Sequence, residues 1–184
     1  CTGQQLDLDF EKKGVVSETE YLRMIELKTA VLVAASLKLG AIIADASDKD
    51  QDLLYEFGRC LGIAFQIQDD VLDTYGDTKM FGKKTGSDIV ANKKTYLLVK
   101  AIELAGGERL SRLRNLLGAG NHDPEQKFRE VKAIYDDLEI RLKAENLAYD
   151  YFNRAFQALD QVSVNAERKN ELKQLAVNLI GRVK

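Results

Sequence analysis

The chain of 184 residues contains a single proline, Pro124, and its apolar residues recur at intervals close to 3.6 almost throughout. Proline interrupts helices, and a period of 3.6 residues places apolar side chains along one face of an α-helix. The pattern therefore predicts an all-α protein, an antiparallel helical bundle whose neighbouring helices are joined by short loops. The expected helices cover about 18–44, 48–75, 92–105, a short stretch ending at 118, 124–159 and 165–182.

Local signals support several of these boundaries. Ser17 followed three residues later by Glu20 is the pattern of a capping box, which starts a helix. Asp48 or Asp50 can cap the second long helix, because a short carboxylate accepts hydrogen bonds from the free N–H groups of the first turn. The glycine- and lysine-rich segment 77–88 predicts a loop.

The composition is that of an ordinary soluble domain. Hydrophobic residues make up 45% of the chain and charged residues 30%, and the formal net charge is −2. Such a small net charge provides no basic surface for nucleic acid or for an anionic membrane. The longest apolar stretch, 30–44, contains Lys38 and is shorter than a membrane span, and the two cysteines form no zinc or disulfide pattern. We therefore expect a cytoplasmic protein without a transmembrane segment.

The segment FQIQDDVLD, residues 65–73, places three carboxylates on an otherwise apolar helix. At about 100° per residue, Asp69 and Asp73 lie about 40° apart, and Asp70 lies within about a third of a turn of both. Gln66 belongs to the same stripe. Carboxylates this close repel one another unless they face water or bind cations. Magnesium suits the arrangement because it prefers oxygen ligands and commonly joins one or two carboxylates to substrate phosphates.

A solvated acidic face is the alternative explanation for any cluster of this kind. Asp136–Asp137, which stand among charged neighbours, fit that alternative. The cluster at Asp69 differs because apolar residues flank it for a full turn on both sides. This difference favours a functional site.

Cations that suit a diphosphate lie elsewhere in the chain. Lys28–Thr29 interrupt the most apolar helix, where a lysine without an anion is costly. Lys83 and Lys84 lie in the glycine-rich loop, and Lys93–Lys94 precede Thr95 and Tyr96. Each lysine alone is typical of a surface, and Lys28 could extend its charged end to the bundle edge. Together with the carboxylates they predict a diphosphate held by both metal and ammonium groups.

The sequence offers no convincing pair of nucleophile and base. His122, the only histidine, stands in the loop sequence GNHDP, which favours a role in a turn. Cys60 lies within an apolar helix and is expected to pack in the core. Chemistry in which metal ions stabilise a departing diphosphate, without a protein nucleophile, fits these residues.

Five segments of the chain, in order, resemble motifs of the trans-isoprenyl diphosphate synthases, or polyprenyl synthetases. The likeness is strong from Gly3 to about Tyr96 and looser beyond. The run FQIQDDVLD resembles the second aspartate-rich motif of that family. The other matching segments are Gly3-Gln4 with Asp7, Lys28-Thr29, Gly82-Lys83 with Gly86 and Asp88, and Lys93 before Thr95-Tyr96.

The resemblance implies an all-α bundle of the isoprenoid synthase type, normally a homodimer. It implies an enzyme, a prenyltransferase that condenses an allylic diphosphate with isopentenyl diphosphate through a carbocation stabilised by three Mg²⁺ ions. Asp69 would be the most direct metal ligand, and Asp70 and Asp73 would act directly or through water. The residues implied in binding substrate or stabilising the cation are Gln4, Asp7, Lys28, Thr29, Gln66, Lys83 and Lys93, of which Lys28, Gln66 and Lys93 would act in catalysis.

The chain departs from the family pattern in one respect. The first aspartate-rich motif of the family, and the arginines that bind isopentenyl diphosphate, precede the Gly-Gln helix and are absent here. The chain also begins at Cys1 with a sequence typical of a helix interior. We therefore expect 1–184 to be the C-terminal portion of one polyprenyl synthetase domain, truncated on its N-terminal side and inactive alone. A native start after processing is the alternative.

Three alternatives remain open from the sequence. One is a non-catalytic partner subunit of a prenyl synthase, although intact Lys28, Asp69 and Lys93 argue against decay of the site. Another is a class I terpene synthase or a head-to-head condensing synthase, although the second metal motif of the terpene synthases, with its serine or threonine and glutamate, does not follow Asp70. The third is an inert helical bundle with an acidic patch, which predicts no coupling between the lysines and the aspartates.

Overall fold

The computed structural model describes residues 2–76, 85–118, 120 and 122–180. All regular elements in these ranges are helices, which confirms the predicted all-α fold. The helices are α1 (Thr2–Lys12), α2 (Glu18–Ile25), η1 (Glu26–Ala30), α3 (Val31–Ile43), α4 (Asp48–Tyr75), α6 (Ser87–Val90), α7 (Tyr96–Leu104), α8 (Gly107–Leu117), α9 (Pro124–Asp137), α10 (Ile140–Gln161) and α11 (Ala166–Ile180). None of these combines the length and the apolarity that a membrane-spanning helix requires.

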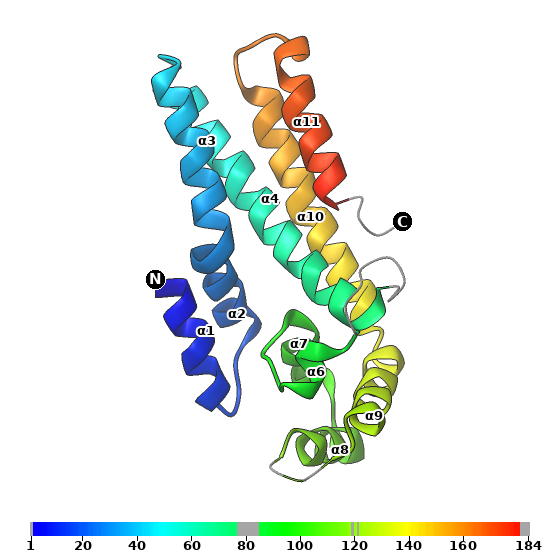
Figure 1. The fold of residues 1–184 in the computed structure, drawn as a ribbon. Coiled ribbons are helices and arrows are strands. Elements are labelled where there is room, and N and C mark those ends of the chain that lie inside the picture. The colour runs from blue at the N-terminus through cyan, green and yellow to red at the C-terminus, as the bar shows by residue number, and fades with distance from the viewer. Residues whose placement is uncertain (1, 77–84, 119, 121, 181–184) are drawn as a thin grey trace.

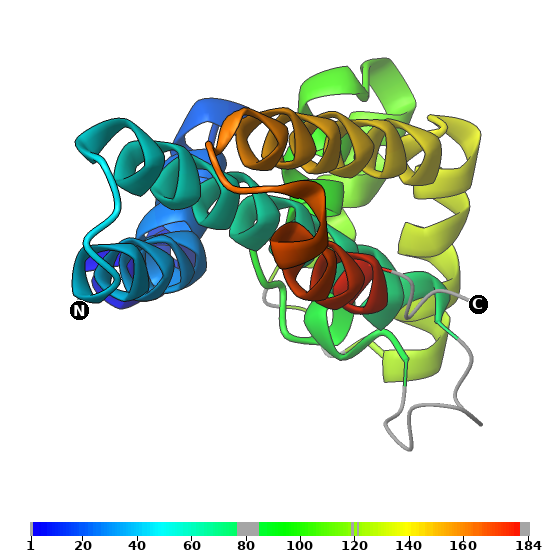
Figure 2. The same ribbon diagram turned by 90° about the horizontal axis from the view of Figure 1, so that it is seen from above.

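Helix α4 is the central element of the bundle. It packs against α3 on one side and against α10 on the other, and both neighbours run antiparallel to it (Figure 1). Seen from above, α4 lies between these two helices, with α11 beside it (Figure 2). Of the residues of α4, Ile63 and Ile67 are almost completely buried, which explains the dense apolar pattern of this segment. The shorter helices α6 to α9 gather at the end of α4 that carries the aspartates (Figure 1).

Several helix boundaries follow the sequence signals. Ser17 and Glu20 form both hydrogen bonds of a capping box at the start of α2, as predicted. Helix α4 is capped by Ser47, whose hydroxyl accepts a hydrogen bond from the backbone N–H of Asp50. The prediction of Asp48 or Asp50 as the cap was therefore wrong by one position or more. Pro124 stands at the first turn of α9, after the capping residue Asp123.

Two predicted helices begin or end elsewhere because a residue adopts a left-handed backbone. Asn92 has φ of 55°, so the segment expected as a helix from 92 starts only at α7, where Thr95 caps it. Glu139 has φ of 53°, and it divides the stretch expected as one helix into α9 and α10. Non-glycine residues rarely adopt this conformation; asparagine does so more often than most, whereas Glu139 gives no such signal.

The helix predicted from 18 to 44 is continuous but contains a π-helical turn, η1, at Glu26–Ala30. This turn packs between α1 and α4. Both partners approach through glycine: a methyl group on Gly3 would lie 2.2 Å from the backbone nitrogen of Lys28, and one on Gly62 would lie 2.6 Å from Cα of Ala30. Close packing on both sides therefore holds the backbone that carries Lys28 and Thr29.

The carboxylate of Asp70 is buried where α2, α4 and α7 meet. Its Oδ2 atom accepts hydrogen bonds from the hydroxyl of Tyr21, at 2.7 Å, and from the backbone N–H of Tyr96, at 2.8 Å. Burial raises the pKa of Asp70 to about 7, although both hydrogen bonds act in the opposite direction. Burial, together with the charge of Asp70, raises the pKa of Tyr21 well above its ordinary value. Tyr21 therefore remains a hydrogen-bond donor at neutral pH.

We predict opposite effects for two glycine-to-alanine substitutions. Gly62→Ala should lower the free energy of unfolding by about 1–3 kcal/mol, because its new methyl group overlaps the backbone of Ala30. Gly40→Ala should raise it by roughly 0.5–1 kcal/mol, because Gly40 is exposed within α3 and nothing lies within 4 Å of the added group. Urea denaturation measures both. Equal stability of the two variants would contradict the close contact between α4 and η1.

We also predict that Asp70→Asn changes how stability depends on pH. The pKa of Asp70 is about 7 in the folded chain and has an ordinary value of 3.8. Between these values the folded chain binds more protons than the unfolded chain, so Asp70 lowers stability as pH rises. Asparagine keeps an acceptor for Tyr21 and carries no charge. The stability of the variant relative to wild type should therefore rise from about pH 4 to pH 7, by up to about 4 kcal/mol.

Urea denaturation across this range, with a chelator present to exclude divalent metal, measures the difference. Comparison with wild type cancels the contribution of every other titrating group. A difference that stays constant from pH 4 to pH 8 would show that burial does not penalise the Asp70 carboxylate.

Candidate active site

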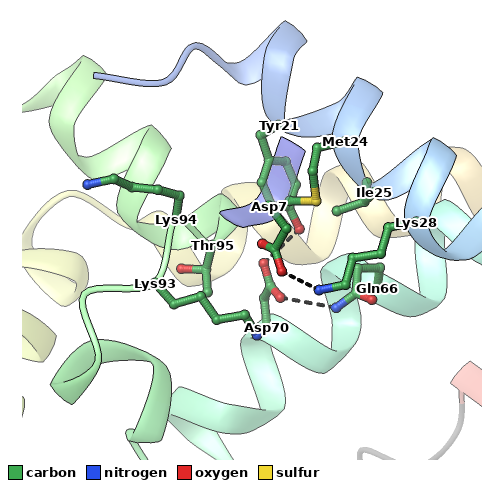
Figure 3. A pocket seen from close by; sticks show the side chains of 10 residues that line it. All are labelled: Asp7, Tyr21, Met24, Ile25, Lys28, Gln66, Asp70, Lys93, Lys94 and Thr95. Atoms are coloured by element: carbon green, nitrogen blue, oxygen red, sulfur yellow. Dashed lines mark hydrogen bonds and ion pairs between the residues drawn. The ribbon is translucent and has the colours of Figure 1, made fainter. Parts of the chain in front are cut away.

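A pocket lies at the aspartate end of α4, between α1, α2, η1 and the segment that precedes α7. The space between these elements, together with the part that is open to solvent, amounts to about 250 Å³. The lining side chains come from segments far apart in the sequence (Figure 3). They are Asp7, Tyr21, Met24, Ile25, Lys28, Gln66, Asp70, Lys93, Lys94 and Thr95.

Lys28 reaches this pocket from the π-helical turn. Its ammonium group forms an ion pair with Asp7 of α1, with 2.5 Å between Nζ and Oδ2, and the two side chains face each other in Figure 3. The Lys28 side chain is 29% exposed and that of Asp7 is 16% exposed. π-helical turns are rare and frequently occur at functional sites. The carboxylate therefore holds the ammonium group at the pocket without closing it off from solvent.

A chain of hydrogen bonds connects η1 to Asp70. The hydroxyl of Thr29 donates to Oε1 of Gln66 at 3.0 Å. This bond leaves the amide NH₂ of Gln66 directed toward Asp70, whose Oδ1 accepts at the longer distance of 3.4 Å (Figure 3). With Oδ2 of Asp70 already bonded to Tyr21 and Tyr96, Oδ1 is the oxygen that remains on the pocket side.

Lys93 contributes a second ammonium group from the segment between α6 and α7. Its Nζ atom lies 3.2 and 3.4 Å from the two carboxylate oxygens of Asp88. Burial by itself lowers the pKa of Lys93, but attraction to Asp88, Asp70 and Asp7 outweighs burial and raises it. Lys93 is therefore charged at neutral pH. The side chain of Lys94 points away from the other labelled groups in Figure 3.

The other two aspartates of the predicted metal cluster lie outside the lining of the pocket. Asp69 is exposed, and Asp73 is partly buried. Asp73 accepts hydrogen bonds from the hydroxyl of Ser87, at 2.6 Å, and from the backbone N–H of Asp88, at 3.0 Å. Burial raises the pKa of Asp88, and the charges of Asp73 and Asp69 raise it further, whereas the charge of Lys93 lowers it. These three carboxylates therefore share one electrostatic environment.

In the part of the chain that the structure describes, no three His, Cys, Asp or Glu side chains are grouped closely enough to hold a metal ion by themselves. Magnesium does not require such a cage, because it usually keeps several waters and binds one or two carboxylates together with substrate phosphates. Asp69 and Asp73, one helical turn apart on α4, supply carboxylates of that kind. The donor set fits magnesium held jointly with a phosphate ligand.

The structure brings Asp7, Lys28, Gln66, Asp70 and Lys93 to one pocket, and Thr29 joins them through Gln66. Gln4 is exposed and, like Asp69 and Asp73, does not line the pocket. Lys83 lies outside the described residues. The roles assigned to all these residues stay predictions.

Sequence reasoning missed Tyr21 and Ser87, which orient the aspartates of α4. The spacing of Tyr21 assigns it to the apolar face of its helix, and this pattern does not reveal that its hydroxyl makes a hydrogen bond. A signal was present, since Tyr21 stands seven residues before Lys28 and two helical turns place such residues on nearly the same face. Ser87 carries no comparable signal. The expectation that Asp136–Asp137 are solvent-exposed is confirmed, although Asp136 also accepts a hydrogen bond from Tyr75.

Residues 1–138 match the family model described as polyprenyl synthetase. The geranylfarnesyl diphosphate synthase of Natronomonas pharaonis is 46% identical over 185 residues, which cover 99% of this chain and 51% of that protein. The geranylgeranyl pyrophosphate synthetase of Pyrococcus horikoshii has a solved structure with a TM-score of 0.89 and 34% identity, covering 99% of this chain and 54% of that one. A polyprenyl synthase of Caulobacter crescentus, solved with calcium and isoprenyl diphosphate, has a TM-score of 0.88 and 31% identity, covering 100% of this chain and 55% of that one.

The chain spans about half the length of the curated relatives it matches. The family model covers three quarters of the chain, including Lys28, the aspartates of α4 and Lys93. The similarity to the solved synthases extends over the whole bundle. On this combined evidence of sequence, fold and site, the chain belongs to the polyprenyl synthetase family.

Proposed function

We propose that residues 1–184 form the C-terminal portion of one polyprenyl synthetase domain, and that the complete enzyme is a trans-isoprenyl diphosphate synthase. Such an enzyme, a homodimer, condenses an allylic diphosphate with isopentenyl diphosphate. One observation carries the proposal: two ammonium groups, from Lys28 on η1 and Lys93 before α7, meet at one pocket beside the aspartates of α4. Two cations at one pocket suit a ligand with several negative charges.

The ammonium groups bind the diphosphate in this proposal. Each already has a carboxylate partner, Asp7 for Lys28 and Asp88 for Lys93, so its position is set before the ligand arrives. An ammonium group has three N–H donors, and the contact between Lys28 and Asp7 uses one of them. The remaining donors are available to phosphate oxygens. Positive charge placed in advance stabilises the leaving diphosphate without rearrangement of the site.

Magnesium, three ions in the complete enzyme, is the proposed cofactor. Asp69 and Asp73 would hold it, and Asp70 could contribute only through Oδ1, because its Oδ2 accepts two other hydrogen bonds. When bound, the metal offsets the negative charge of the departing diphosphate. The polyprenyl synthase of Caulobacter crescentus was solved in complex with calcium and isoprenyl diphosphate, which supports a divalent metal together with a diphosphate.

The chemistry proposed for this site needs no protein nucleophile. Cys60 does not line the pocket, and burial raises the pKa of its thiol to about 12, so it stays protonated at neutral pH. Gln66 presents amide hydrogens at the pocket, and Met24 and Ile25 add apolar surface beside the charged groups. This surface limits the access of water to a carbocation formed there.

In the complete enzyme, Asp69→Ala should reduce the rate of prenyl transfer by about 10²–10³, the usual cost of losing one electrostatic stabiliser. Asp137→Ala is the matched control, because Asp137 is an exposed aspartate on α9, away from the pocket. Incorporation of labelled isopentenyl diphosphate in MgCl₂ measures the rate.

Two results would contradict the proposed function. A complete protein that folds and binds a synthase partner, yet forms no labelled product with any allylic primer, is a non-catalytic subunit. A protein that converts an allylic diphosphate to a hydrocarbon without isopentenyl diphosphate is a terpene synthase.

The 184-residue chain itself should bind inorganic diphosphate weakly in MgCl₂ and catalyse no prenyl transfer. Lys28→Met should weaken this binding roughly tenfold or more, because it removes a charged hydrogen-bond donor while keeping most of the unbranched side chain. Lys38→Met is the control, since Lys38 also pairs with an aspartate, Asp52, but outside the pocket. Isothermal titration calorimetry measures both affinities. Equal affinities would remove Lys28 from the proposed site.

A further inference from the structure

We propose that Lys127, a buried lysine of α9 that does not line the pocket, is a positioning residue that fixes the ammonium group of Lys93 by holding Asn92. The inference rests on the proposed function, because it deepens the account of how the diphosphate site is built. It rests on the hydrogen bonds that Lys127 donates and on the burial of the Lys127 side chain, on the side of residues 90–96 opposite the pocket.

Lys127 donates two hydrogen bonds to the segment that leads to Lys93. Its Nζ atom lies 3.0 Å from the backbone oxygen of Val90 and 2.7 Å from Oδ1 of Asn92. Val90 ends α6, and Asn92 directly precedes Lys93. Lys127 is only 7% exposed, and within the described residues it forms no ion pair. A lysine buried against neutral acceptors contributes little net stability. We therefore infer that Lys127 serves to fix the position of the groups that it contacts.

Asn92 sets the direction in which the backbone enters Lys93, and its contact with Lys127 helps to hold it in place. Its φ of 55° lies in the left-handed region, so the backbone turns at the residue before Lys93. Its side-chain NH₂ donates to the backbone oxygen of Leu117 at 3.2 Å, while its oxygen accepts from Lys127. The amide is therefore held between α8 and α9. The side chain of Lys93 turns toward Asp70, and that of Lys94 turns away (Figure 3).

The segment from Asn92 to Tyr96 is fixed at both ends. On the pocket side, the backbone N–H of Tyr96 donates to Asp70, and that of Lys93 donates to the backbone oxygen of Asp88. On the opposite side, Lys127 is the charged group that contacts Asn92. The side chain of Lys93 is 40% exposed and is held by Asp88 alone among its described partners. Without Lys127, the side chain of Asn92 keeps its bond to Leu117 but loses its bond to the ammonium group, and the loosened turn lets Lys93 sample orientations that leave the pocket.

The chain provides a matched control. Lys169 of α11 is also 7% exposed and also donates to a backbone oxygen, that of Asp160, at 2.8 Å. It packs at the other end of the bundle, where α10 and α11 meet, and does not line the pocket. Lys169→Met therefore removes a buried lysine and its hydrogen bond without touching the segment before α7.

The test compares Lys127→Met, Asn92→Gly, the double variant and Lys169→Met in the 184-residue chain. Glycine accepts the left-handed backbone at position 92 and removes only the side-chain amide. Amide hydrogen exchange, followed by NMR at Lys93 and Thr95, reports on the segment. Calorimetry with inorganic diphosphate in MgCl₂ reports on the site.

We expect Lys127→Met and Asn92→Gly each to speed exchange at Lys93 and Thr95 and to weaken diphosphate binding about tenfold. The double variant should bind no more weakly than Asn92→Gly alone, because in this proposal Lys127 acts on Lys93 through Asn92. Lys169→Met should leave both readouts within twofold of wild type, even if it lowers the melting temperature as much as Lys127→Met.

The proposal is overturned if Lys127→Met changes neither readout, if exchange rises while affinity stays the same, or if Lys169→Met weakens binding equally. Should Lys127→Met fail to fold, Asn92→Gly decides the same question. If calorimetry shows that the wild-type chain binds no diphosphate, the diphosphate site of the proposed function is refuted. The exchange rates would still show whether Lys127 holds the segment.

Discussion

The buried carboxylate of Asp70 is the contact on which the site depends. Tyr21 reaches it from α2 and the backbone of Tyr96 reaches it from the first turn of α7, so one side chain of α4 joins three helices. A buried carboxylate is costly unless it is hydrogen-bonded, and any rearrangement that removed either donor would expose that cost. The requirement to satisfy Asp70 therefore fixes where α2 and α7 lie relative to α4. Both segments that carry the pocket lysines are continuous with those two helices.

The remaining charges at the pocket are arranged in pairs. Lys28 lies against Asp7 and Lys93 against Asp88, and each pair is partly open to solvent. Exposed pairs of this kind contribute little to stability, since water screens them and side-chain entropy opposes them. They nevertheless keep both ammonium groups from turning into bulk solvent. A site for a highly charged ligand can thus persist in a chain whose net charge is close to zero.

Much of the fold could be predicted from the sequence because it depends on local signals. The single proline and the apolar period give the helices, and the capping box at Ser17 gives the start of α2. The stripe of aspartates was also correctly placed on one helix. Periodicity could not predict which of these aspartates is buried: Asp70 is buried, whereas Asp69 is exposed. That difference is made by Tyr21 and Tyr96, which come from other parts of the chain, and the first turn of α7 was itself misplaced because Asn92 adopts a left-handed backbone.

The π-helical turn has a consequence for the whole of the long apolar segment. A turn of this type contains one residue more than an α-helical turn, so α2 and α3 are rotated relative to each other by about 100° compared with an uninterrupted α-helix. One continuous segment can therefore direct α2 toward α1 and α7 while α3 faces α4. Loss of one residue from Glu26–Ala30 would let the segment run as a plain α-helix, and both faces would keep their partners, because the extra residue is the one that the π-helical turn absorbs. What would change is the backbone that presents Lys28 and Thr29, so the extra residue serves the pocket rather than the packing of the flanking helices.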